Sequence, residues 1–111
     1  MEIYVDTVAD VTIASIVGEL DGQTAPIAQD QILSLIVPEA RILLDMTELQ
    51  FMSSAGARTL LLIYRQIQAN NGGVILAGLI PEIGEMLSAT GFLDYFEVVE
   101  TVDDGLALFG V

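Results

Sequence analysis

The chain has 111 residues, 53% of them hydrophobic, which is enough apolar material for one domain with one core. Sixteen acidic residues against three arginines and no lysine give a formal net charge of -13, which argues against binding to nucleic acid or to an anionic membrane surface. The lack of cysteine and histidine excludes disulfides, thiol chemistry and the commonest general base.

The N-terminal sequence MEIYVDTVAD is acidic and alternates between apolar and polar side chains. A secretory signal peptide would instead begin with basic residues followed by an apolar run. No segment approaches the roughly 18 consecutive apolar residues that a membrane-spanning helix needs. We therefore expect a cytoplasmic protein with no membrane partner.

Two strands are predicted at the start of the chain. Residues 2–7 alternate as a half-buried strand does, and residues 11–17 are rich in β-branched side chains. The short gap between them predicts an antiparallel hairpin. The glycines of residues 18–22 are expected to break the second strand.

A helix and a buried strand follow. Thr24 is a suitable N-cap and Pro26 is tolerated in a first helical turn, so the helix should begin here and stop by Pro38. Residues 41–44 are apolar after the arginine, which is typical of a central strand covered on both faces. The predicted buried side of the helix consists of Ile27, Ile32, Leu35 and Ile36.

The second half of the chain alternates helices and strands. Helices are predicted over residues 55–70, 81–90 and 101–108, with strands over residues 74–77 and 97–99. The order β-β-α-β-α-β-α-β-α predicts one α/β domain over residues 1–111. Its hairpin should lead into a mixed, mainly parallel sheet of four to five strands with about four helices. The predicted buried stripe of the longest helix consists of Ala57, Leu60, Leu61, Tyr64 and Ile67.

Ser53 and Ser54 stand at the start of this longest helix, where backbone N–H groups lack partners. A serine here could be a plain N-cap, or it could accept a phosphate, with Arg58 four residues beyond Ser54. A nucleophilic serine would need a base, and the chain has no histidine or lysine. Because phosphate-loop, G-x-S-x-G and calcium-loop spacings are also missing, we expect no enzyme, no metal and no cofactor.

Two neighbouring features could bind a partner. On the outward face of the helix Leu62 lies between Arg58 and Arg65, and Thr59, Ile63 and Gln66 lie beside them. This face could be a partner surface with an apolar centre, a homodimer contact, or simply a deeply covered helix. The loop at residues 18–24 ends the second strand on the same side of the sheet, where ligands gather in open α/β folds, although Asp21 could simply make a turn with Gly22.

The sequence DMTELQFMSSAGAR at residues 45–58 resembles the signature of STAS domains, and more narrowly that of bacterial anti-sigma-factor antagonists. The resemblance covers essentially the whole chain. It includes Gly18-Glu19-Leu20-Asp21, Thr24-Ala25, Asn71-Gly72-Gly73, Pro81-Glu82 and Thr90-Gly91-Phe92, in the expected order.

The resemblance implies a partner switch. The unphosphorylated antagonist binds an anti-sigma factor that is also a serine kinase, which releases the sigma factor. Phosphorylation at the helix start ends binding, and a metal-dependent serine phosphatase reverses it. The family's acceptor falls on Ser54; where the family often has aspartate and serine on either side, this chain has Ser53, a rival acceptor, and Ala55. The candidate partner-binding residues are Asp21, Thr24, Met52, Ser53, Gly56, Arg58, Leu62 and Arg65.

Two other functions remain open at this point. One is a STAS module that works as a scaffold or accessory subunit, as in a stressosome or a lipid-transport machine, without a serine switch. The other is a small-molecule or nucleotide-binding domain, which ranks last because a glycine-rich phosphate loop is missing.

Overall fold

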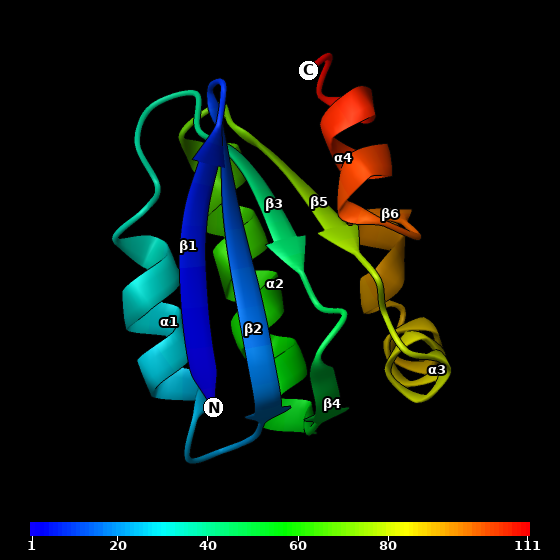
Figure 1. Cartoon of the computed structure of the whole chain (residues 1–111). Coiled ribbons are helices and arrows are strands. Elements are labelled where there is room, and N and C mark those ends of the chain that lie inside the picture. Colours follow the sequence, from blue (N-terminus) through cyan, green and yellow to red (C-terminus); the bar gives the residue numbers. More distant parts are fainter.

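The computed structural model describes residues 1–111, and its framework is one mixed six-stranded sheet (Figure 1). The strands run in the order β1-β2-β3-β5-β6, and β4 pairs with β2 beyond the end of β3. Only β1 and β2 are antiparallel, so the predicted hairpin and mainly parallel sheet are confirmed. The strands are β1 (Glu2–Val8), β2 (Val11–Leu20), β3 (Arg41–Asp45), β4 (Leu49–Met52), β5 (Gly73–Ala77) and β6 (Glu97–Val99). The helices are α1 (Ala25–Leu33), α2 (Ser54–Ala69), α3 (Pro81–Thr90) and α4 (Val102–Leu108), with a 3-10 turn, η1 (Phe92–Tyr95).

Strand β2 is longer than predicted because it has two successive parallel partners. Residues 11–15 pair with β3, and residues 18–20 pair with β4 after an irregularity at Gly18, whose φ is 106°. The predicted break at residues 18–22 is therefore wrong for its first three residues. Strand β4 was not predicted, because its buried residues, Leu49 and Met52, do not alternate with exposed ones. This pairing brings the end of β2 beside the start of α2.

Helix α1 ends at Leu33, five residues before Pro38. After the helix the hydrogen-bond pattern changes to that of a 3-10 turn, because the N–H groups of Leu35 and Ile36 donate to carbonyls three residues back. Ile27 is 51% exposed, so its predicted place in the core is wrong. The helix packs closely against α2 through the small side chains of Ala25 and Ala28, together with Ile32.

Most of the core lies between the sheet and helices α1, α2 and α3. On α2, Ala57, Leu60 and Ile67 are buried as predicted, while Leu61 and Tyr64 are half-buried. Ile63 is also buried rather than on the outward face, on the side of α2 against which α1 packs, which agrees with the predicted alternative of a deeply covered helix. The same holds for Thr59, which is 7% exposed.

Helix α4 covers the opposite face of the sheet over β3 and β5 (Figure 1). Its residues Val102 and Leu106, together with Phe109, close a small second cluster. Gly105 permits this contact, since a Cβ there would lie 2.6 Å from Leu43 Cδ1. None of the helices is both long enough and apolar enough to cross a membrane.

Candidate functional site

Ser53 and Ser54 have different environments at the start of α2. Ser53 is the N-cap, with extended backbone (φ −87°, ψ 175°), and its Oγ accepts a hydrogen bond from the N–H of Gly56 at 3.3 Å. Ser54 is the first helical residue; it is exposed, and no protein group is hydrogen-bonded to its hydroxyl. The capping role thus belongs to Ser53, and a free hydroxyl belongs to Ser54.

The serines are held in place from below by β2 and β4. The N–H of Ser53 donates to the carbonyl of Leu20 at 2.9 Å. Gly56 lies over the same carbonyl, and a Cβ at this position would be 2.5 Å from it. Met52 is 5% exposed and lies under Gly56. Met52 and Gly56 were predicted to bind a partner, and the structure places both beneath the surface, where they fix the position of the serines.

The loop between β2 and α1, residues 21–24, is organised by Asp21 and is called the Asp21 loop below. One carboxylate oxygen of Asp21 accepts hydrogen bonds from the N–H groups of Thr24, at 3.0 Å, and Gln23, at 2.9 Å. Thr24 is the N-cap residue of α1, as predicted, but its hydroxyl makes no hydrogen bond to the first turn of the helix. Instead, the hydroxyl of Thr24 donates to the carbonyl of Glu19 and accepts from the N–H of Asp21, both at 2.9 Å. Asp21 therefore makes a local turn.

The two N–H groups, first that of Thr24 and then that of Gln23, hold the pKa of Asp21 below its ordinary value. The charged form of Asp21 thus stabilises the folded chain above the ordinary pKa of 3.8, and this stability is lost as pH falls through the lower folded-state pKa. We expect Asp21→Asn to be less stable than the wild type at pH 7 and to lose this deficit at strongly acid pH. Urea denaturation of both proteins across this range checks the prediction; a deficit independent of pH would contradict it.

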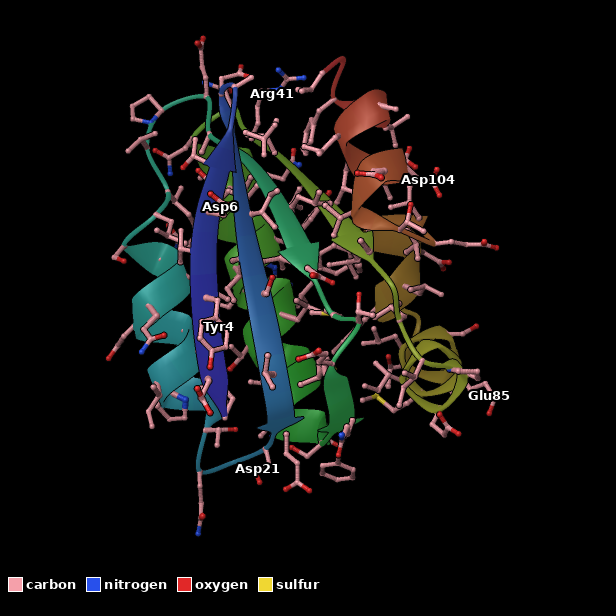
Figure 2. All side chains as sticks on the ribbon, in the orientation of Figure 1. Tyr4, Asp6, Asp21, Arg41, Glu85 and Asp104 are labelled. Atoms are coloured by element: carbon pink, nitrogen blue, oxygen red, sulfur yellow. The ribbon has the colours of Figure 1, made fainter.

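A shallow depression joins the Asp21 loop to the start of α2. It has a volume of about 280 Å³. Both segments lie at the same end of the molecule, the lower end in Figure 1, and Figure 2 places Asp21 there. The depression is lined by Gly22, Ala25, Pro26, Gln29, Ala55, Arg58, Thr59 and Leu62. Of the predicted residues, Arg58 and Leu62 line the depression, and Asp21 and Ser54 adjoin it through their chain neighbours Gly22 and Ala55. Arg65 lies roughly 10 Å further along α2.

The three cations of the chain are used differently. Arg41 forms the single salt bridge, at 2.9 Å to Asp10, and stacks over the ring of Phe109 at the opposite end of the sheet (Figure 2). Arg58 and Arg65 are exposed and form no ion pair. The outward face of α2 consequently carries two unpaired positive charges on an otherwise acidic protein. No group of three acidic side chains is arranged to hold a metal ion.

Phe51 belongs to the same end of the molecule and was not predicted as a site residue. It is 50% exposed on β4, directly opposite Glu19 of β2. Together with Gln50, Glu82 and Met86 it borders a second depression, of about 230 Å³, between β4 and α3. The sequence shows an aromatic residue three positions before Ser54, but it does not show that this residue is exposed. The exposure of Phe51 depends on strand β4, which was not predicted.

The fold and the site define a class of protein: a small α/β domain whose candidate functional site is an exposed surface around the start of a helix. Residues 2–105 match the STAS domain family, and the chain belongs to that family. It is 28% identical to BtrV of Bordetella bronchiseptica, named as a candidate anti-sigma factor antagonist, over 98% of this chain and 95% of the relative.

Two solved structures extend the comparison. The first is an anti-sigma factor antagonist from Mycobacterium paratuberculosis, 25% identical, with a TM-score of 0.82 over 96% of this chain and 92% of the other. The second is the Bacillus cell fate determinant SpoIIAA in its phosphorylated form, with a TM-score of 0.74 over 97% and 99%. At 21% identity, the second structure is evidence of a shared fold.

Proposed function

We propose that this protein is an anti-sigma-factor antagonist that works by partner switching. In its unphosphorylated form it binds an anti-sigma factor that is also a serine kinase, and so releases the sigma factor. Phosphorylation of Ser54 ends the binding, and a metal-dependent serine phosphatase restores it. The observation that carries the proposal is the exposed, unpartnered hydroxyl of Ser54 at the start of α2, beside the Asp21 loop.

The position suits a phosphate that the fold must tolerate. A phosphoserine carries about -1.5 to -2 charges at neutral pH. At the first residue of α2 it would meet the positive end of the helix dipole and backbone N–H groups without helical partners. Arg58 lies one turn further along the same side of the helix, and no carboxylate is paired with it. The domain can therefore stay folded after phosphorylation while its surface charge changes.

Ser53 is a poorer acceptor for a physical reason. Its Oγ caps α2 through the N–H of Gly56, and its backbone N–H is bonded to Leu20. A kinase that used Ser53 would have to draw this oxygen out of the cap, at a cost of about 1 kcal/mol. Ser54 can be reached with the helix intact.

Phosphopeptide mapping after incubation with the cognate kinase and ATP tests the assignment. We expect the phosphate on Ser54 in the wild type and in Ser53→Ala, and no phosphorylation of Ser54→Ala. The Ser53→Ala variant is the matched control, because it removes the neighbouring hydroxyl and keeps the acceptor. Phosphate on Ser53 alone would overturn the site assignment.

A further inference from the structure

Strand β1 is an open edge of the sheet. It is the first strand in the sheet order, and β2 is the only element against which it packs extensively. Five of its seven residues are exposed. Tyr4 and Val5, in the middle of the strand, are 58% and 52% exposed, which is high for large apolar side chains in a sheet. Figure 2 shows Tyr4 and Asp6 along this strand.

The direction of the unpaired backbone groups follows from the hairpin. A two-residue loop, Ala9-Asp10, connects β1 and β2, so Val8 and Val11 close the hairpin as a hydrogen-bonded pair. The bonding alternates along an antiparallel strand, so Asp6, Tyr4 and Glu2 also bond to β2. The outward N–H and C=O groups are therefore those of Ile3, Val5 and Thr7. In agreement, the N–H of Thr7 donates to the side chain of Asp6, at 2.8 Å, rather than to β2.

This edge lacks the usual protections against pairing. Edge strands are commonly guarded by lysine, by proline or by a bulge. The chain contains no lysine, and its prolines lie at positions 26, 38 and 81. The register between β1 and β2 runs without a shift from Glu2 to Val8. Only the two acids, Glu2 and Asp6, oppose the approach of another strand.

We propose that β1 pairs antiparallel with β1 of a second copy of the chain, about a twofold axis at Val5. In this register Val5 faces Val5, Ile3 faces Thr7, Tyr4 faces Asp6 and Glu2 faces Val8. Val5 then bonds to Val5 and Ile3 to Thr7, whose N–H would exchange its bond to the Asp6 side chain for the carbonyl of Ile3. A twofold axis at Tyr4 would place Glu2 opposite Asp6, and one at Asp6 would place Asp6 opposite itself. The axis at Val5 is the central register that avoids facing acids.

The pairing joins two six-stranded sheets into one continuous sheet. Its interface is one seven-residue strand pair, which belongs to the small class below about 1,200 Å². The net charge of -13 on each copy opposes association, and salt screens this repulsion. The dimer is therefore weak and tightens as salt is added. The proposed dimer uses neither Ser54 nor the outward face of α2. A test that rejects the dimer therefore leaves the proposed function unaffected, and the reverse also holds.

The absence of cysteine makes single-cysteine cross-linking a clean test. Facing residues of a hydrogen-bonded pair have Cα atoms about 5.5 Å apart, within the range of a disulfide. We expect Val5→Cys to form a disulfide-linked dimer readily. Thr7→Cys alone should not, because the axis at Val5 separates the two copies of residue 7 by roughly 13 Å. An equal mixture of Ile3→Cys and Thr7→Cys should form mixed dimers.

Leu108→Cys is the control for cross-linking by random collision, because Leu108 is 55% exposed and lies on α4, away from β1. If Val5→Cys cross-links no faster than Leu108→Cys, the proposal is wrong. Efficient cross-linking of Thr7→Cys alone would overturn the register.

Sedimentation equilibrium of the unmodified chain gives an independent readout. We expect a monomer–dimer equilibrium whose association constant rises with sodium chloride concentration. Val5→Lys should lower it at least tenfold while leaving the circular dichroism spectrum unchanged, because two ammonium groups would meet at the axis. A monomer at every protein and salt concentration would overturn the proposal.

Discussion

Ser54→Asp is expected to weaken binding to the cognate anti-sigma factor by about a hundredfold or more, while Ser54→Ala binds like the wild type. Ser54 is exposed beside the Asp21 loop, so an added carboxylate would enter the proposed interface together with its charge. Removing such a charge from water without a partner costs several kcal/mol. A loss of about 3 kcal/mol corresponds to roughly a hundredfold in affinity. Isothermal titration calorimetry with the purified partner measures the effect directly.

Ser88→Asp is the matched control for this result. Ser88 is an exposed serine on α3, so the substitution adds the same charge on another helix. We expect its affinity to stay within about threefold of the wild type, as is usual for charges away from an interface core. If Ser54→Asp and the wild type bind identical partners with equal affinity, the serine is not a switch. The scaffold function would then be the better account of the chain.

Gly56→Ala is expected to destabilise the domain by about 1–3 kcal/mol, as overpacking in a tight core does. The new Cβ would lie 2.5 Å from the carbonyl oxygen of Leu20. That oxygen belongs to the backbone and already accepts the N–H of Ser53, so it cannot turn away. This steric clash can be relieved only if the start of α2 moves away from β2 and β4. Chemical denaturation at pH 7 measures the loss.

Gly84→Ala is the natural comparison, because Gly84 lies inside α3 and, apart from its chain neighbours and the backbone of its own helix, nothing lies within 4 Å of its missing Cβ. Alanine is a better helix former than glycine, so this variant should be more stable by up to about 1 kcal/mol. If the free energy of unfolding falls for Gly56→Ala and rises for Gly84→Ala, the steric effect of the Leu20 carbonyl at Gly56 is separated from the effect of helix propensity. If Gly56→Ala costs less than about 0.5 kcal/mol, the packing beneath the serines is looser than the distances indicate.

The parts of the fold that sequence reasoning found are those with strong local patterns. The hairpin and helix α2 have a periodicity, and the central strand β3 has an uninterrupted apolar run, that match the structure. Strand β4 was missed because it has four residues and no alternation, and it exists only because the end of β2 is available to pair with it. Ile63 was misplaced for a related reason: its burial depends on α1, which is far away in the sequence.

The candidate site residues were predicted to share one end of the sheet, and the structure gives several of them distinct hydrogen-bonding environments. Two adjacent serines look alike in a sequence, and the dihedral angles at Ser53 distinguish the cap from the free hydroxyl. From the sequence, Thr24 was likewise predicted as the N-cap of α1 and Asp21 as a turn or partner-binding residue. The turn at Asp21 takes up the hydroxyl of Thr24 before it can cap the helix. Such competition between neighbouring hydrogen bonds is invisible in a residue pattern.

The double pairing of β2 has a consequence for how a partner would meet this surface. The last residues of β2 lead directly into the Asp21 loop, and the carbonyl of Leu20 is bonded to the N–H of Ser53. The loop and the start of α2 are therefore parts of one rigid body, although about 30 residues separate them in the sequence. A partner need not order either segment before it binds, which lowers the entropic cost of association. A phosphate on such a prearranged surface would change its charge and leave its shape intact.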